Sequence, residues 1–196
     1  NSGSEEQKEL PQGQRIRKLA RINAKLVDEV HAAGGQAAGI FNEIFSLRTP
    51  PADDPEFDFR RMVEHLTLQP IRKAVAKRHI PVISPVVMDR GGVSRVVSAE
   101  KVSKALCARI KPQKFIVMSE REGLVDTDGK LIKNIILSTD YKGLLNSGRL
   151  DSEALSQLDA GVRVLREVPD LTIQFASAGN LLQELFTVKG RGTYIR

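Results

Sequence analysis

The chain has few of the residues on which several classes of protein depend. Its 196 residues include one cysteine, no tryptophan and only 5% aromatic residues. A single cysteine excludes an internal disulfide and a thiolate-only metal site, and scarce aromatic side chains leave no stacking platform for single-stranded nucleic acid. No apolar run approaches the ~20 residues that span a bilayer, and we expect no signal peptide. These absences predict a soluble, intracellular protein without a membrane partner.

Positive charge is the first property that the chain has in excess. The net charge is +6 and the sequence pI is about 9.6. Such a balance suits a polyanionic partner, but the 30 basic residues are scattered and form no run. A solvated basic surface is therefore favoured over a nucleic-acid site, and a basic interaction module stays as an alternative function.

Hydrophobic periodicity begins after a polar start. Residues 1–14 are too polar to bury much surface, so we expect a linker or a disordered terminus there. From Arg15, apolar residues recur every three or four positions and predict a helix that ends at Gly34 and Gly35; they are Ile16, Leu19, Ile22, Leu26 and Val30. An α/β domain that starts on a helix lacks a preceding strand. Residues 15–196 therefore read as the C-terminal part of a domain whose N-terminal strands are missing.

Strands then alternate with helices along the rest of the chain. Apolar, β-branched runs predict strands that are buried on both faces, and helical periodicity separates them. The expected strands are 80–87, 94–97, 114–118, 171–176 and 193–195, with helices from Pro70 to about Arg78, after Ser98, around Leu158 and around Leu182. Asp128-Gly129 predicts a hairpin turn within 125–132. This order predicts an α/β fold, a three-layer αβα sandwich with a mainly parallel sheet.

The titratable residues form no recognisable catalytic or metal site in the sequence. The three histidines lie apart in the chain, and no catalytic residue and no metal ligand is predicted among them. Asp126 and Asp128 resemble part of a calcium loop, but no glutamate follows at the required register. Cys107 is expected on a helix beside apolar neighbours, as an inert core residue. Ser119–Gly123 follows a strand, the position where open α/β sheets place ligands.

The C-terminal segment carries a specific motif. The sequence from Leu182 to Ile195, LQELFTVKGRGTYI, resembles the closing helix, turn and strand of the amino-acid kinases that comprise acetylglutamate kinases and N-acetylglutamate synthases. It is most similar to the kinase-like domain of the synthases, and further likeness covers 80–85, 110–117, 122–130 and 134–141. The resemblance implies an amino-acid-kinase-like fold over residues 15–196.

Two positions depart from the kinases of this family. The family places an aspartate in an N-x-N-x-D sequence, whereas this chain has Val96-Val97-Ser98-Ala99-Glu100. A family lysine is expected where Asp159, Ala160 and Gly161 stand. Phosphoryl transfer depends on positive charge around the transferring group. The resemblance therefore implies a pseudokinase, although a fragment of an active acetylglutamate kinase stays as an alternative.

The resemblance also implies two binding sites. In arginine-sensitive members, L-arginine binds against the last helix and the glycine turn; here Glu184 would contact the guanidinium, and Gly190, Gly192 and Thr193 would present backbone. Arg90 and Arg95 fall in the region that holds an acidic substrate in the kinases. The alternative is that Glu184 is an ordinary surface acid and the glycines form a plain turn.

The leading interpretation is the regulatory, kinase-like domain of an N-acetylglutamate synthase. No cofactor is expected in this segment, because acetyl-CoA would be the substrate of a separate acetyltransferase domain. The resemblance implies L-arginine as effector and a homo-oligomer formed through this domain. It places the protein in the mitochondrial matrix of a eukaryote, or otherwise in the cytoplasm.

Overall fold

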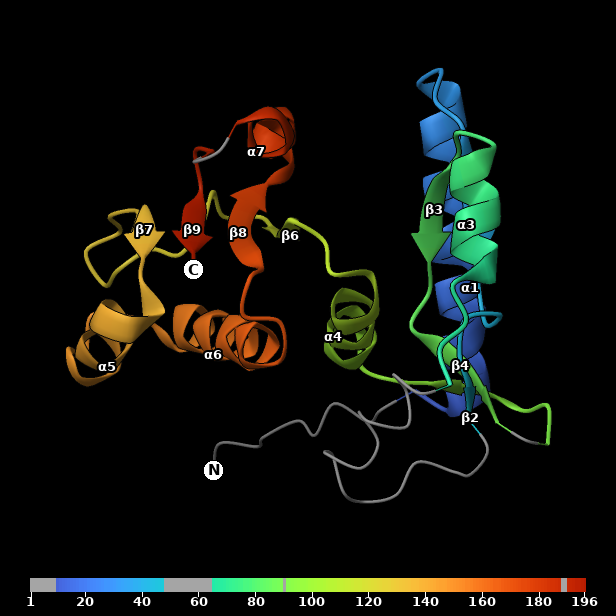
Figure 1. Cartoon of the computed structure of the whole chain (residues 1–196), viewed down its shortest axis with the longest axis horizontal. Coiled ribbons are helices and arrows are strands. Elements are labelled where there is room, and N and C mark those ends of the chain that lie inside the picture. The colour runs from blue at the N-terminus through green and yellow to red at the C-terminus, as the bar shows by residue number, and fades with distance from the viewer. Residues whose placement is uncertain (1–9, 48–64, 90, 188–189) are drawn as a thin grey trace, which may run out of the picture. The chain divides into compact units, whose positions relative to one another are not determined.

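The computed structural model describes residues 10–47, 65–89, 91–187 and 190–196. The chain divides into two compact units, residues 1–105 and 106–196, and its elements are labelled in Figure 1. Four of the six strand pairs in the described residues are parallel, as expected for an α/β fold, and the sheets do not close into a barrel. None of the helices described is both long and apolar enough to cross a membrane.

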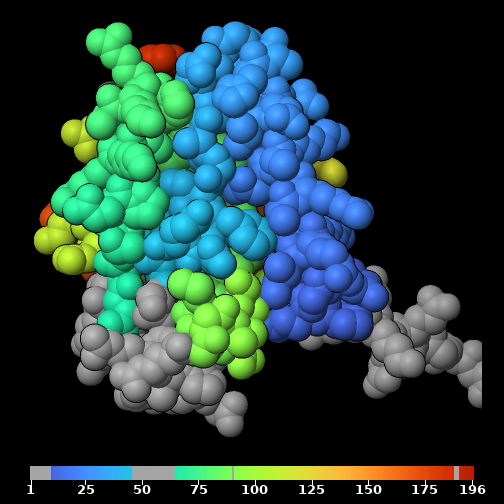
Figure 2. All heavy atoms as spheres, turned by 90° about the vertical axis from the view of Figure 1, so that its right-hand side faces the viewer, coloured from blue at the N-terminus to red at the C-terminus, as the bar shows by residue number. Residues whose placement is uncertain are grey.

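The first unit is built around two parallel strands and a long helix. Helix α1 (Gln12–Ala32) begins at Gln12 rather than at the predicted Arg15, and Gly34 ends it with a φ of 84°. Strands β1 (Ala37–Ile40) and β3 (Ile80–Ile83) pair in parallel, and α3 (Gln69–Ala76) packs against both. In the space-filling view of this unit, α1 runs along one side and α3 along the other (Figure 2).

The most deeply buried residue of α1 is polar. The predicted apolar face includes Ile22 and Leu26, but these side chains are 45% and 51% exposed. Asn23 is buried instead, and its amide donates to the Val82 carbonyl (2.8 Å) and to the Ser84 hydroxyl (2.9 Å). Because a buried amide is costly unless it is hydrogen-bonded, these contacts favour the orientation of α1 in which Asn23 faces β3.

The predicted strand 80–87 is wrong as a single element. The structure has β3 (Ile80–Ile83) and then β4 (Val86–Asp89), which belongs to a different sheet. Pro85 lies between them, and proline has no backbone N–H with which to continue a ladder. Strand β4 pairs in parallel with β2 (Ser46–Leu47) and antiparallel with β5 (Ser94–Val96), which confirms the predicted return strand.

The second unit contains a four-stranded sheet. Helix α4 (Ala99–Ile110) contains the boundary between the two units and precedes the first strand of this sheet. The strands are β6 (Lys114–Ser119), β7 (Asn134–Ile135), β8 (Thr172–Ser177) and β9 (Thr193–Ile195). Their order is β6-β8-β9-β7, so β9 lies between β8 and β7 (Figure 1). Strand β6 is thus an edge strand rather than the fully buried strand predicted, and Met118 is 49% exposed.

Helices α5 (Leu137–Asn146) and α6 (Ser152–Glu167) supply much of the core of this unit. Asp151 caps α6 by accepting a hydrogen bond from the Ala154 N–H (2.7 Å). Leu158 and Val162 of α6 are buried in one cluster with Ile173 and Phe175 of β8. After β8, a short 3-10 helix (Ala178–Asn180) leads into α7 (Leu181–Phe186).

Burial makes Cys107 unreactive, and this can be tested. Its side chain is 5% exposed, and desolvation raises the pKa of the thiol from 9.0 to about 11. Because only the thiolate is nucleophilic, each unit by which the pKa rises lowers the thiolate concentration about tenfold. We expect a thiol reagent such as DTNB to label the native chain at pH 8 at least about a hundredfold more slowly than the urea-unfolded chain. Comparable rates would contradict the buried environment.

Candidate ligand site at the glycine turn

The turn between α7 and β9 is held by a buried carboxylate. Glu184 is fully buried, and its Oε1 accepts hydrogen bonds from the N–H groups of Arg191 (2.6 Å) and Gly192 (2.9 Å). Gly190 has a φ of 56°, and a Cβ atom there would overlap the carboxylate of Glu184. Glycine is therefore required at position 190 both by backbone conformation and by space.

Two further side chains hold the end of α7. The Lys114 ammonium donates to the carbonyls of Glu184 (2.7 Å) and Thr187, two groups that the end of a helix leaves without intrahelical partners. The Thr187 hydroxyl donates to the Gln183 carbonyl (2.6 Å) and accepts from the Gly190 N–H (2.9 Å). The N–H groups of residues 190, 191 and 192 are thus all engaged within the protein.

Thr193 ties the turn to the hairpin 125–132 and to the residue that precedes it, Leu124. It is buried; its hydroxyl accepts from the Leu124 N–H (2.7 Å) and donates to the Ile132 carbonyl (2.7 Å). A Cβ atom at Gly192 would overlap the carbonyl oxygen of Phe175 in β8. Absence of a side chain at residue 192 therefore lets the turn and the neighbouring strand approach closely.

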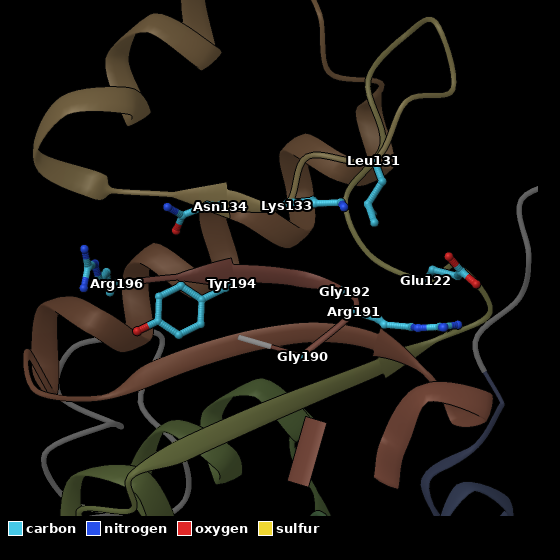
Figure 3. Close-up of a pocket in the computed structure, with 9 residues that line it drawn as sticks. All are labelled: Glu122, Leu131, Lys133, Asn134, Gly190, Arg191, Gly192, Tyr194 and Arg196. Carbon is cyan, nitrogen blue, oxygen red and sulfur yellow. The ribbon is translucent and has the colours of Figure 1, made fainter. Parts of the chain in front are cut away.

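A pocket of about 730 Å³ opens beside this turn. Along β9, Ile195 is buried in the core, so Gly192, Tyr194 and Arg196 alternate onto the opposite face. Asn134 of β7 pairs with Tyr194 and lies on that same face. Nine residues line the pocket, and Figure 3 shows them: Glu122, Leu131, Lys133, Asn134, Gly190, Arg191, Gly192, Tyr194 and Arg196.

Positive side chains dominate this lining. Lys133, Arg191 and Arg196 are cationic and exposed, and Glu122 is the single acid. Among the residues that the structure describes, none of these four takes part in an ion pair. Arg191 extends toward the side of the pocket where Glu122 lies, and Arg196 lies at the far side beside Tyr194 (Figure 3).

The predicted arginine-binding residues are brought together, but in two layers. Gly190 and Gly192 line the pocket. Glu184 and Thr193 are buried beneath them and bond to the protein's own backbone. Glu184 is therefore no ordinary surface acid.

The predicted acidic-substrate residues lie in the first unit. Arg95 forms an ion pair with Asp89 (2.9 Å), and Arg90 is outside the described residues. The backbone N–H of Val93, and then Arg95, hold the pKa of Asp89 below its ordinary value. The guanidinium of Arg95 is thus already engaged by a carboxylate of its own chain.

Sequence reasoning missed seven residues of the pocket lining: Glu122, Leu131, Lys133, Asn134, Arg191, Tyr194 and Arg196. Tyr194 and Arg196 could have been found, because the predicted strand 193–195 has to expose every second residue on one face. Glu122 and Lys133 come from the two ends of the hairpin segment, and no local pattern indicated that both would lie beside the closing strand.

A second, open hollow lies at the carboxyl ends of β6 and β8. Its volume is about 550 Å³, and it is lined by Met118, Ser119, Glu120 and residues 177–179. Ser119 and Glu120 belong to the segment 119–123, which the sequence predicts at a ligand position. Open α/β sheets place ligands at the carboxyl ends of their parallel strands, and this hollow lies there.

Asp126 organises the hairpin rather than a calcium loop. It is 4% exposed, and its carboxylate accepts from the N–H groups of Asp128 (3.1 Å) and Lys130 (2.8 Å) and from Arg149 (2.8 Å). Gly129 has a φ of 78°, as a tight turn requires, whereas Asp128 has no positive φ. The backbone of Lys130 first, and then Arg149, lower the pKa of Asp126.

The mostly parallel α/β fold of the chain is similar to that of a solved carbamate kinase. That kinase, from Giardia lamblia and bound to AMP-PNP, matches 98% of this chain and 75% of its own chain, with a TM-score of 0.63 and 12% identity. The sequence matches the amino acid kinase family over residues 2–167, and the chain belongs to that family.

Acetylglutamate kinases are among the relatives of the chain within the family. The one from Xanthomonas campestris pv. campestris is 28% identical over 183 residues, which cover 92% of this chain and 42% of the relative. The one from Methanospirillum hungatei is 28% identical over 90% of this chain and 65% of the relative. The chain thus spans about two fifths to two thirds of the length of these relatives.

The fold is also that of a solved N-acetylglutamate synthase. The structure of the Neisseria gonorrhoeae synthase, complexed with coenzyme A and N-acetyl-glutamate, matches with a TM-score of 0.71 and 17% identity. The match covers 93% of this chain and 43% of the synthase. This likeness establishes the fold.

Removing the charge of Asp126 should destabilise the hairpin in a pH-dependent way. The folded-state pKa of this carboxyl is depressed, so its contribution is present above the unfolded value of about 3.9 and is lost as pH falls through the folded value. We expect Asp126→Asn to lower Tm by several degrees at pH 7. The difference from wild type should narrow below about pH 4, as measured by circular dichroism melts. A difference that does not change with pH would contradict the prediction.

Proposed function

We propose that this chain is a regulatory, kinase-like segment of an N-acetylglutamate synthase that responds to L-arginine. The observation that carries the proposal is the turn 190–192, which is held by the buried Glu184 and forms part of a pocket wall. A second structure of the N. gonorrhoeae synthase, complexed with coenzyme A and L-arginine, is similar over 81% of this chain with a TM-score of 0.61 and 18% identity.

The carboxylate of Glu184 suggests how L-arginine would act on the turn. Oε1 is shared by two backbone N–H groups, and Oε2 has no hydrogen-bond partner among the described residues. A guanidinium pairs with both oxygens of a carboxylate in fork geometry. To reach Glu184 it would have to displace the N–H groups of Arg191 and Gly192, so we propose that arginine binding rearranges the turn and the start of β9.

We expect L-arginine to bind the intact chain, and its affinity to depend on the charge of Glu184. We expect Glu184→Gln to weaken the affinity by about tenfold or more, because a charge-assisted bidentate pair is replaced by a neutral contact. The glutamine retains a carbonyl that can accept from the turn, so the variant should keep its fold. Isothermal titration calorimetry measures the affinity, and thermal melts check folding.

The matched control for this test is Asp170→Asn. Asp170 is an exposed acid at the other end of β8 from α7, and its removal should leave the arginine affinity unchanged. No binding to the wild-type chain, or equal binding to wild type and Glu184→Gln, would refute the arginine site.

Loss of phosphoryl transfer is the second part of the proposal. Where the family lysine is expected, Asp159 accepts a hydrogen bond from the Tyr141 hydroxyl (2.9 Å). Gly161 is buried beside Phe175, and Glu100 lies in the first turn of α4. An aspartate where a lysine is expected would repel phosphate.

The chain should therefore fail to bind Mg-ATP. We expect no saturable binding of a fluorescent ATP analogue below millimolar concentration, because the electrostatic partners of the phosphates are absent. An acetylglutamate kinase measured under the same conditions provides the positive control. Micromolar binding that ATP competes away would favour the alternative, a fragment of an acetylglutamate kinase that phosphorylates N-acetyl-L-glutamate.

The whole protein is proposed to contain more than this segment. A separate acetyltransferase domain would use acetyl-CoA and glutamate, in the mitochondrial matrix or in the cytoplasm. The exposed apolar side chains of α7 support a further proposal, that this segment assembles into a homo-oligomer. Leu182, Leu185 and Phe186 are 70%, 52% and 82% exposed. Exposed apolar side chains at this spacing are typical of a helix that packs against a partner.

A further inference from the structure

We infer that the exposed side of α1 docks an acidic, amphipathic helix of a partner protein. Residues 12–27 of α1 include five basic residues and no acid; the basic residues are Arg15, Arg17, Lys18, Arg21 and Lys25. The basic residues of the chain form no run in the sequence, but the helix gathers these five within about four turns. Figure 2 shows the side chains of α1, in darker blue, at the surface along one side of the first unit.

The cations of α1 repel one another in the isolated chain. Arg17, Arg21 and Lys25 recur at intervals of four residues, so each lies beside the next on the helix surface, where like charges are unfavourable. Neither these three nor Lys18 takes part in an ion pair with another described residue. A partner that brings carboxylates to this side of α1 would relieve the repulsion, whereas a neutral or basic partner would not.

An apolar seam runs beside these cations. Leu19, Ile22 and Leu26 are spaced by three and four residues, which is the a/d spacing of a helix that packs on another helix. The side chains of Ile22 and Leu26 are 45% and 51% exposed, while Asn23 faces β3 on the buried side. Within the described part of the chain, the seam therefore faces solvent.

Lys18 and Lys25 flank the seam. Each stands one residue before a seam leucine, at the g position of the heptad, where paired helices carry the charges that determine partner choice. An open hollow of about 390 Å³ lies along the same stretch, and its lining is Leu10, Gln14, Arg17, Lys18, Arg21 and Ile22. Apolar and cationic side chains so close together match a helix that carries leucine next to glutamate.

The seam and its lysine flank together distinguish a helix from other anionic partners. Nucleic acid would leave the seam without an apolar counterpart, and α1 has no Phe, Tyr or Trp on which a base could stack. A membrane surface requires a wider apolar face than Ile22 and Leu26 provide, because the opposite side of α1 packs on strands. A second copy, paired antiparallel through the same seam, would set lysine against lysine. An acidic helix satisfies both the seam and its flank.

This inference goes beyond the proposed function and does not rest on it. The residues of the seam and its flank lie in the first unit, whereas Glu184 and the turn 190–192 lie in the second. L-arginine affinity should therefore be the same in wild type and in every α1 variant. Each proposal can thus fail while the other stands.

Fluorescence anisotropy with two labelled peptides tests the inference on the whole chain. Both peptides contain three heptads with leucine at a and d; one carries glutamate at e and g, and the other carries lysine there. We expect saturable binding of the glutamate peptide and at least about tenfold weaker binding of the lysine peptide. Raising NaCl from about 50 to about 500 mM should weaken binding of the glutamate peptide several-fold, because salt screens the charge pairs.

Two double variants separate the flank from the seam. Lys18→Glu/Lys25→Glu should invert the preference, so that the lysine peptide binds at least about tenfold more tightly than the glutamate peptide. Ile22→Ser/Leu26→Ser retains every cation and should still lose about tenfold or more in affinity for the glutamate peptide, because the apolar contact is removed. Thermal melts check that each variant folds.

The matched control is Lys73→Glu/Lys77→Glu, which makes the same change in charge at exposed residues within and just after α3. It should bind the glutamate peptide as wild type does. Glutamate-peptide binding that is absent, that the Ile22→Ser/Leu26→Ser variant retains, or that the lysine peptide equals would overturn the docking site. Tighter binding to POPC/POPG vesicles or to a DNA duplex would also overturn it, as would sedimentation showing a wild-type dimer that Ile22→Ser/Leu26→Ser dissociates.

Discussion

The second unit depends on one buried carboxylate. Glu184 accepts the N–H groups of Arg191 and Gly192 and so determines how the chain turns from α7 into β9. Strand β9 is central, because it joins β8 on one side and β7 on the other. Without the turn, the sheet would lose the strand that connects its parallel pairs. A buried carboxylate is costly unless it is hydrogen-bonded, so burial and turn geometry stabilise each other.

Buried polar side chains organise the backbone elsewhere as well. Asn23 orients α1 through the Val82 carbonyl, and Asp126 shapes the hairpin through two N–H groups and Arg149. In each case a polar atom meets backbone groups that would otherwise lack partners. The apolar core supplies most of the driving force for folding, and these polar contacts select one arrangement of the elements around it.

The pocket lies on the face of the sheet that the core leaves open. Alternation along β9 places Ile195 in the core and Tyr194 and Arg196 in the pocket. The same short strand therefore contributes to the core with one face and lines the pocket with the other. The turn 190–192 belongs both to the Glu184 network and to the pocket wall, and a ligand that moves the turn would change the pocket.

The sequence by itself determined the α/β class, most helices and strands, and the closing motif around Glu184, because these depend on local periodicity and turn residues. Helix α6 and strand β9 lie where apolar spacing predicted them. Tertiary structure alone decided that Asn23 is buried in place of Ile22 and Leu26, that Pro85 divides 80–87 between two sheets, and that Glu184 lies beneath the turn. It also brought Glu122 and Lys133 beside Arg196. These outcomes depend on hydrogen bonds and contacts between residues that are distant in the chain, and local patterns carry no record of such partners.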